Sequence, residues 1–466
     1  MLEEVQLVGL VGPTHHYAGM SWGNVASERH KGSPSSPRRA ALQSVALMRE
    51  LISLDQHVLV MPPLYRPDLS LLERFGLRGT GDDLLRSAAL HPDLLSMASS
   101  ASSMWTANAG TWAPGRDTQD GVARLVVANL VAKAHRSLEP PGTEAHLRAI
   151  FGDDPSVEVL SALPSTPAFG DEGAANHMRL ASPRSDTALH VFVYGRLGDE
   201  PADAAWEERN PTLVAAPLHQ GTPPLPLYPA RQSLRASQAV ARRLHLAPEQ
   251  TFFLRQHPQA IRAGVFHNDV AAISCGAFLL HHELAYVEDE AASALWERCA
   301  ALLGEDYQRV VVPAAEVSLE EAVRTYLFNG QLFDRGGGRL VFLLPDTCRT
   351  SEAVQRCLTR ICRAHRRITE VRYVDLHQSM RNGGGPACLR LRLQMTAEQL
   401  QAVPQGFRMT LGSLDQLEHW ASAHLADELH PADLAEPSFV AACHRALDAL
   451  RRVLDAPSLY AATLGA

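Results

Sequence analysis

Cysteine is scarce in this sequence. The 466 residues include seven cysteines, all between Cys275 and Cys443, and no two of them have the CxxC spacing. This scarcity excludes a disulfide framework and a cysteine-rich zinc site as organising features. In a reducing compartment isolated thiols remain free, and one of them can act as a nucleophile. We therefore expect a cytoplasmic protein.

Long apolar runs and a surplus of basic residues are also missing. No run of 18 apolar residues occurs, and the first residues, Met1 to Glu4, lack the basic character of a signal peptide. We therefore expect no membrane association. The 43 basic side chains are outnumbered by 51 acidic ones, which gives a net charge of -8. Such a balance argues against a protein that binds nucleic acid through its phosphates.

Motifs for bound cofactors are absent as well. There is no GxxxxGK[ST] phosphate loop, and the glycine run 335–339 reads as a turn between strands, not as a dinucleotide fingerprint before a helix. No HExxH helix occurs, and the adjacent His15 and His16 would point apart. We therefore expect no metal and no cofactor.

Short apolar runs alternate with amphipathic segments, which predicts an α/β fold. Strands are expected at 5–11, 58–61, 123–129, 190–194, 252–255, 270–274, 278–282, 309–312, 340–344, 370–375 and 388–394. Helices are expected at 38–53, 233–244, 290–303, 319–326, 352–364, 414–425 and 439–454. The pair 270–274 and 278–282 flanks the turn-forming Cys275-Gly276 and predicts a hairpin, which argues against a simple doubly wound sheet.

The stretch 198–229 is rich in Pro, Ala and charge and has no apolar periodicity, so we expect a surface insertion there. The length alone would allow about three domains. An asparagine recurs beside strands, in Phe266-His267-Asn268-Asp269, Leu327-Phe328-Asn329-Gly330 and Arg381-Asn382-Gly383. By itself this recurrence is compatible with ordinary turn chemistry.

The most unusual local sequence is the run 382–388, Asn-Gly-Gly-Gly-Pro-Ala-Cys, which leads into an alternating strand. Three glycines carry a large backbone entropy cost, so they indicate a loop whose amides approach something closely. Cys388, at the entry to the strand, could be held as a thiolate nucleophile. Spacing alone favours the alternative, a glycine turn followed by a buried structural cysteine.

A thiol nucleophile needs a proton carrier. His267 and Asp269 stand two apart at the start of a predicted strand, so both are expected on one face, although an ordinary turn explains them too. Glu172 lies in a second polar cluster, 170–177, which could also be a helix start. Gly19-Met20-Ser21-Trp22-Gly23 fits the nucleophile elbow GxSxG, but no central strand is expected before it.

Eight strings in this chain resemble the N-succinylarginine dihydrolase family over nearly its whole length. They are THHYAGMSWGNVAS, SSMWTANAGTWAP, AHRSLE, GDEGAANH, YPARQ, GVFHND, TYLFNGQL and NGGGPACLRLR. The family belongs to the guanidine-modifying superfamily. The resemblance implies a pentein fold, an α/β propeller of five ββαβ-type units around a pseudo-fivefold axis, with additional C-terminal helices. Residues 1–466 would then form one catalytic domain with 198–229 as an insertion.

The resemblance also implies the site. Cys388 would be the nucleophile, His267 the general acid and base, and Glu172 its carboxylate partner, with Asp269 binding the guanidinium. Further substrate-binding residues would be Ala18, Gly19, Met20, Ser21, Trp22, Gly23, Asn24, Val25, Ala26, Ser27, Asn108, His135, Arg136, Arg231 and Asn382. The implied substrate is N2-succinyl-L-arginine, hydrolysed to succinylornithine, two ammonia and carbon dioxide in arginine catabolism. The resemblance further implies a homodimer.

Alternatives remain within this interpretation. A deiminase that stops at the ureido product, or an amidinotransferase, would use the same cysteine, histidine and acid. A non-catalytic binding protein on the same scaffold is the alternative from another class. The presence of Cys388, His267, Glu172 and Asp269 together argues against the last one.

Overall fold

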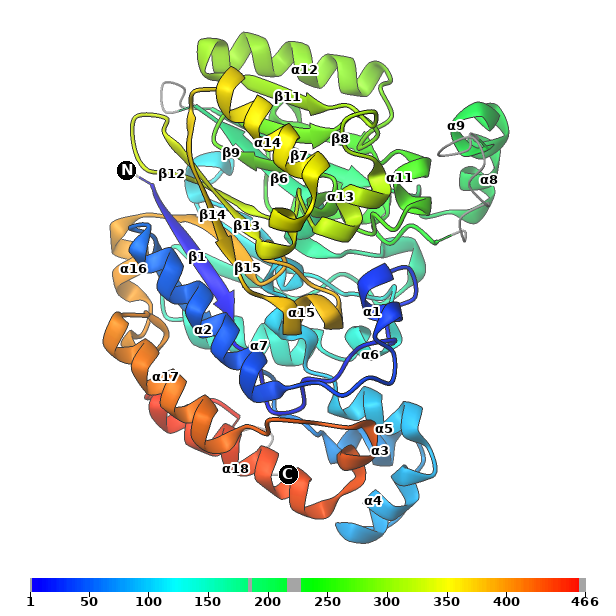
Figure 1. Cartoon of the computed structure of the whole chain (residues 1–466), viewed down its shortest axis with the longest axis vertical. Helices are drawn as coiled ribbons and strands as arrows, with labels where there is room; N and C mark the ends of the chain where they lie inside the picture. Colours follow the sequence, from blue (N-terminus) through cyan, green and yellow to red (C-terminus); the bar gives the residue numbers. More distant parts are fainter. Residues whose placement is uncertain (1, 183–186, 216–227, 461–466) are drawn as a thin grey trace.

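The computed structural model describes residues 2–182, 187–215 and 228–460. Its strands form five small sheets of three strands each (Figure 1). The first sheet, in the order β15-β1-β2, joins the two ends of the chain. Its strands are β1 (Glu3–Gly9), β2 (His57–Met61) and β15 (Arg390–Met395). β1 pairs antiparallel with β15 and parallel with β2, so residues near the two ends lie side by side.

The other four sheets repeat this topology. In each, the first two strands pair antiparallel and the third returns parallel to the second. The strands are β3 (Gly110–Ala113), β4 (Ala123–Val127) and β5 (Val157–Leu160); β6 (His177–Ala181), β7 (Ala188–Tyr194) and β8 (Thr251–Arg255); β9 (Ala272–Cys275), β10 (Phe278–His282) and β11 (Gln308–Val312); β12 (Gln331–Asp334), β13 (Leu340–Pro345) and β14 (Ile368–Val374).

Helices make the crossovers that parallel pairing requires. The main ones are α2 (Pro37–Ser53), α7 (Pro140–Phe151), α10 (Leu234–Arg243), α12 (Glu290–Leu303) and α14 (Glu352–Ala364). Shorter helices are α1 (Val25–Arg29), α3 (Leu69–Arg74), α4 (Asp82–Ala89), α5 (Pro92–Ser99), α6 (Ala134–Ser137), α11 (Pro258–Arg262), α13 (Leu319–Thr325), α15 (His377–Asn382) and α16 (Ala397–Ala402). The predicted α/β class with ββαβ units is confirmed.

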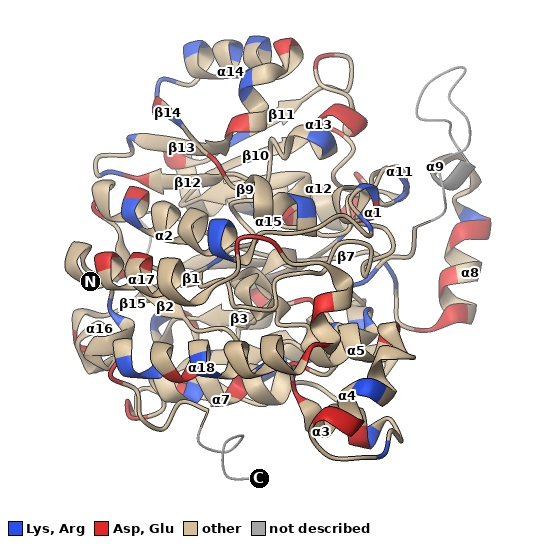
Figure 2. Ribbon diagram, turned by 60° about the horizontal axis from the view of Figure 1, so that its bottom comes forward, with Lys and Arg blue, Asp and Glu red and all other residues tan. Residues whose placement is uncertain are grey.

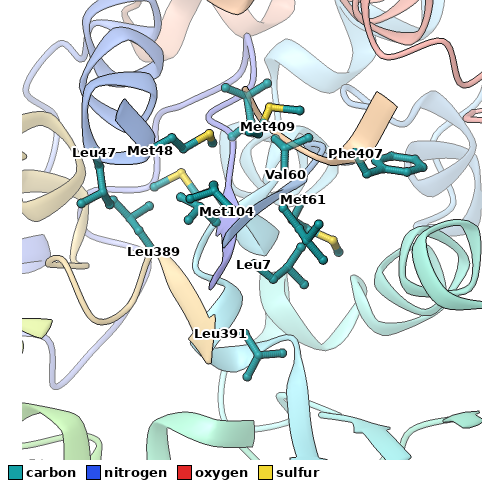
Figure 3. Packing of buried hydrophobic residues seen from close by; sticks show 14 of the residues in the cluster. Leu7, Leu47, Met48, Val60, Met61, Met104, Leu389, Leu391, Phe407 and Met409 are labelled. Atoms are coloured by element: carbon teal, nitrogen blue, oxygen red, sulfur yellow. The ribbon is translucent and has the colours of Figure 1, made fainter. Parts of the chain in front are cut away.

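The expected C-terminal helices are also confirmed. α17 (Leu411–His424) and α18 (Pro437–Val453) pack together, and α17 packs on α2 (Figure 1). Figure 3 shows the core beneath them, where Leu7, Val60, Met104, Leu389 and Met409 converge from segments far apart in the chain. The two ends of the chain are thus fixed to one another by burial of apolar side chains, which is the dominant favourable contribution to folding.

The stretch 198–229, which the sequence predicts to be a surface insertion without apolar periodicity, contains two helices in its first part. α8 (Glu200–Arg209) and α9 (Pro211–Ala215) lie there, and α8 projects at the edge of the molecule (Figure 2). α8 buries none of its residues, so its sequence lacks the apolar stripe from which a helix is predicted. Its alanines and glutamates nevertheless favour a helix. Residues 216–227 of the predicted insertion lie outside the described residues.

Among the described residues, no helix has the length and apolar character needed to cross a membrane. All seven cysteines are unpaired, and six of them are buried.

Buried histidines predict how stability depends on pH. Burial lowers the pKa of His15, His146, His257 and His281, among others, to about 4. The unfolded chain, with histidine pKa values near 6.5, binds protons more readily, so stability is lost as the pH falls from 6.5 towards 4. Each histidine should cost about 2 kcal/mol at pH 5. We expect the urea midpoint to be clearly lower at pH 5 than at pH 7.5.

Two buried carboxyl groups act in the opposite direction. The pKa values of Asp171 and Asp269 are raised to about 6 and about 7, mainly by burial, so protonating them in this range favours the folded state. The stability gained at these two carboxyl groups is smaller than the stability lost at the four histidines. An unfolding midpoint that stays level or rises between pH 7.5 and pH 5 would contradict the prediction.

Candidate active site

Cys388, His267, Glu172 and Asp269, which are far apart in sequence, converge at the ends of strands of different sheets. Glu172 is the N-cap residue of the 3-10 helix η5 (Gly173–Asn176), just before β6. His267 is the N-cap residue of η7 (Asn268–Val270), just before β9. Cys388 lies in the turn before β15. Each of these three residues therefore lies just before a strand, namely β6, β9 or β15.

Two predictions of local geometry are corrected here. His267 and Asp269 do not share one face of a strand, because 268–270 forms the 3-10 turn η7 and β9 begins only at Ala272. That turn is fixed by the Asn268 amide, which donates to Asn176 Oδ1 at 2.9 Å. The strand predicted to begin at Cys388 begins at Arg390, since the Arg390 amide bonds back to the Ala387 carbonyl and closes a turn.

The histidine and the glutamate form a buried pair. His267 Nε2 lies 2.7 Å from Glu172 Oε2, and each residue is 1% exposed. Burial lowers the pKa of His267 to about 4, against the hydrogen bond to Glu172, so the imidazole is neutral at pH 7. Burial alone would raise the pKa of Glu172, but the hydrogen bond with His267 and the charges of Arg231 and Arg136 outweigh it and lower the value to about 2. The carboxylate is therefore ionised.

The thiol of Cys388 lies 3.8 Å from Asp269 Oδ2. Asn329 Nδ2 donates to Cys388 Sγ at 3.3 Å, and the same amide nitrogen lies 3.3 Å from the Asp269 carbonyl. Burial, followed by the neighbouring Asp269 carboxyl, raises the pKa of the Cys388 thiol. The resting protein thus holds a neutral thiol, where the glycine loop had suggested a stabilised thiolate.

Two arginines complete this group. Arg136 Nη1 and Arg231 Nη1 each lie 3.8 Å from Glu172 Oε2, and both side chains are 3% exposed. Arg231 also stacks over the ring of Phe266, with its central carbon 4.6 Å from the ring centre. Within the part of the chain that the structure describes, the second guanidinium nitrogen, Nη2, of each arginine is buried without a hydrogen-bond partner. Two cations facing one carboxylate leave an excess of positive charge for anions.

Other buried polar atoms of this region are also unpaired. They are His267 Nδ1, Asp269 Oδ1 and His135 Nε2. Buried polar groups are normally hydrogen-bonded, so such a concentration calls for an explanation. A polar ligand that carries both a cation and carboxylates would satisfy donors and acceptors together.

The segment Ala18 to Ser27 packs against the loop before Cys388. Asn382 Oδ1 accepts from the amides of Tyr17 and Ala18 at 2.7 and 3.1 Å, and Asn24 Nδ2 donates to the Gly383 carbonyl at 2.7 Å. Ser27 Oγ accepts from the Gly19 amide at 3.0 Å. Asn382, Asn24 and Ser27 thus hold the segment and the glycine loop together.

Not every predicted substrate residue faces the centre. Trp22 is 55% exposed and packs edge-on against Tyr228. Val25 and Ala26 line a separate cavity of about 560 Å³ that none of the four reactive residues lines. Met20 packs against the apolar core, Ser21 is buried, and the Gly23 amide donates to Glu28. Asn108 Nδ2 donates to the Glu172 carbonyl at 2.6 Å and so positions that residue.

Two residues of the site were missed from sequence. Asn329 contacts the thiol, although Leu327-Phe328-Asn329-Gly330 looked like turn chemistry. Lys133 is buried beside the arginines, and its Nζ donates to the Trp22 carbonyl at 2.6 Å. Burial lowers the pKa of Lys133 to about 8. The recurrence of asparagine beside strands was the available signal for Asn329; nothing marked Lys133.

Comparison with known proteins shows to which family the chain belongs. A sequence model described as succinylarginine dihydrolase (AstB) matches residues 1–462. The chain belongs to the succinylarginine dihydrolase family. It is 42% identical over 458 residues to the N-succinylarginine dihydrolase of Pseudomonas fluorescens (strain SBW25), covering 98% of both chains. It is 43% identical over 459 residues to that of Cronobacter sakazakii (strain ATCC BAA-894), again covering 98% of both chains.

Among solved structures, the chain is similar to the N-terminal domain of ArgZ, an arginine dihydrolase from cyanobacteria. The TM-score is 0.49 at 16% identity, covering 84% of this chain and 97% of that one. For a succinylarginine dihydrolase family member, the geometry above places a thiol, a neutral imidazole, two carboxyl groups and two guanidinium groups in one enclosed region.

Proposed function

We propose that this protein hydrolyses N2-succinyl-L-arginine to N2-succinyl-L-ornithine, two ammonia and carbon dioxide, as a step of arginine catabolism. The observation that carries the proposal is the buried group of Cys388, His267, Glu172 and Asp269 beside two arginines with unpaired nitrogens. A guanidinium is a permanent cation and a poor electrophile, so it needs carboxylates to hold its nitrogens and a thiolate directed at its carbon. This region offers the carboxylates and the thiol from which the thiolate forms.

The substrate itself would activate the thiol. Its guanidinium, bound between the carboxylates of Glu172 and Asp269, places a positive charge beside Cys388 and Asp269. That charge lowers the pKa of both groups. Cys388 passes its proton to the neutral His267 as Sγ attacks the central carbon, which gives a tetrahedral adduct, and the imidazolium then delivers that proton to the departing ammonia.

Water then completes the first cycle. Breakdown of the adduct leaves a thiouronium on Cys388; a water that gives a proton to His267 attacks it, the carbon–sulfur bond breaks, and a ureido group remains. In the second cycle the thiolate attacks the ureido carbon and ammonia leaves. A second water then releases a carbamate, which decomposes to carbon dioxide and the amine of succinylornithine. Each cycle consumes one water and releases one ammonia.

The two carboxylates of the substrate match the excess of positive charge. Arg136, Arg231 and Lys133 surround one ionised glutamate, and the arginine Nη2 atoms have no hydrogen-bond partner among the described residues. The planar fork of a guanidinium binds a carboxylate through two hydrogen bonds. An α-ammonium in place of the succinylamide would instead face donors and a like charge.

Free arginine should therefore be a poor substrate. We expect its kcat/KM to be at least about 100-fold below that of succinylarginine, because a buried ammonium would lack acceptors. Succinylarginine should release two ammonia per molecule, and succinylcitrulline one. Comparable turnover of arginine would contradict the assigned substrate. One ammonia per succinylarginine would favour a single-cycle deiminase, and transfer of the amidino group to an added amine an amidinotransferase.

We also propose that residues 1–466 act as one catalytic unit, located in the cytoplasm and assembled as a homodimer. Support for a reducing compartment comes from the seven unpaired cysteines. The dimer rests on the family resemblance, and light scattering on the purified protein tests it, since a monomer mass would contradict the proposal.

A further inference from the structure

A second cavity borders the reaction centre from the side of the inner strands. Its volume is about 120 Å³. Trp112 of β3, Arg179 of β6, Ser274 of β9 and Arg392 of β15 line it, so the first or last strands of four sheets form its wall. Asp269 lines it as well. None of the predicted substrate-binding residues other than Asp269 does so.

Burial differs sharply between members of the reaction centre. Cys388, His267 and Glu172 are 3%, 1% and 1% exposed, whereas Asp269 is only partly buried. Ala174 and Ala387, the neighbours of Glu172 and Cys388 in the cavity wall, are also partly exposed. All three residues line the cavity, although Asp269 Oδ1 itself is buried, so the cavity meets the edge of the reaction centre at these residues.

The residues that line the cavity are small in one part and polar or charged in another. Ala174, Ala387 and Gly330 line the cavity close to Glu172, Cys388 and Asn329 in the sequence, and Phe328 and Arg390 complete that part of the wall. At the other end stand Ser274 and the arginines Arg179 and Arg392, whose charges are compensated by Asp117 and Glu4. At about 30 Å³ per water, the cavity has room for about four waters. It is too small for succinylarginine.

The proposed reaction requires small molecules to enter and leave the reaction centre. Two waters must reach the carbon bound to Cys388, and two ammonia must leave, while the ureido intermediate stays in place between the cycles. If the substrate side had to open for each exchange, the intermediate could escape. A separate route for water-sized neutral molecules removes that conflict.

We propose that this cavity is the passage through which water enters and ammonia leaves during both cycles. The inference rests on the proposed function, because only a reaction that keeps its intermediate needs such a passage. Obstructing the cavity should slow ammonia release and force exchange through the substrate side, with loss of succinylcitrulline into solution.

The experiment enlarges one residue at each end of the cavity. Ser274→Phe fills the end remote from the centre, and Ala174→Leu fills the near end. We expect kcat to fall at least about fivefold, and the ratio of ammonia to succinylarginine consumed in the initial rate to fall from two towards one, with succinylcitrulline detected by chromatography. Ser293→Phe on exposed helix α12 is the matched control and should keep the ratio of two.

The outcomes separate the two proposals. If wild-type protein releases one ammonia per succinylarginine, the two-cycle function fails, and the passage is then judged by whether Ser274→Phe slows that single release. If the wild-type ratio is two and Ser274→Phe keeps the wild-type ratio and rate with an unchanged melting temperature, the passage is overturned. Ser274 lies outside the reaction centre, so its variant tests the passage even where Ala174→Leu disturbs Glu172 or fails to fold.

Discussion

Replacing Cys388 with serine should abolish turnover of succinylarginine, with a loss of at least about a thousandfold in the rate of ammonia release. Serine nearly preserves the shape of the side chain and its contacts with Asn329 and Asp269. Its hydroxyl is a far weaker nucleophile, and His267, neutral with a pKa lowered to about 4, is a weak base for activating it. Ammonia is measured by a coupled assay, and succinylarginine binding by calorimetry.

Binding should survive this change, because the carboxylates and arginines remain. The matched control is Cys362→Ser in α14, a partly buried cysteine that makes no contact with the reaction centre. That variant should retain full activity. If the Cys388 variant kept more than a tenth of wild-type ammonia release, another group would have to be the nucleophile.

Local sequence patterns predict the elements of this chain well where burial imposes periodicity. Helices α12 and α14 were predicted with their observed bounds, because each buries one apolar stripe. The hairpin of β9 and β10 follows from Gly276, whose φ of 55° suits glycine in the turn. The sequence did not predict α8, because it buries none of its residues. It also did not predict the short strands β3, β5, β6 and β12, because four or five residues carry little pattern.

The reaction centre is harder to predict from local sequence. An ordinary structural role could explain the local sequence around Cys388, His267 and Glu172. Only the family resemblance assigned catalytic roles to these residues. Their proximity depends on the placing of separate sheets, which no local spacing encodes. Two of the asparagines beside strands prove informative in retrospect: Asn329 contacts the thiol, and Asn382 holds the segment that contains Ala18. At Asn268 the backbone amide, not the side chain, fixes the turn after His267.

Glu172 and its neighbour Asp171 allow a second test, because their surroundings shift the pKa values of the two carboxyl groups in opposite directions. Glu172 faces Arg136, Arg231 and His267, and its pKa is lowered to about 2; Asp171 is equally buried, but burial raises its pKa to about 6. Replacing Glu172 with glutamine leaves two buried guanidinium groups without their carboxylate. Breaking such a buried pair typically costs about 3 to 5 kcal/mol. It also removes the charge that stabilises His267 when protonated, which should lower kcat/KM by about 10² to 10⁴.

Asp171→Asn is the matched control for this prediction. Asp171 Oδ1 accepts from the Gly173 amide and from Gln232, contacts that an asparagine oxygen can keep, and Oδ2 has no partner to lose. A group that burial already drives towards its neutral form should tolerate a neutral substitute, at a cost under about 1 kcal/mol. The stability due to Glu172 is present above pH 4.5 and is lost as the pH falls towards 2. Wild type and Glu172→Gln should therefore converge in unfolding free energy at low pH, while equal effects of the two substitutions at pH 7 would refute the contrast.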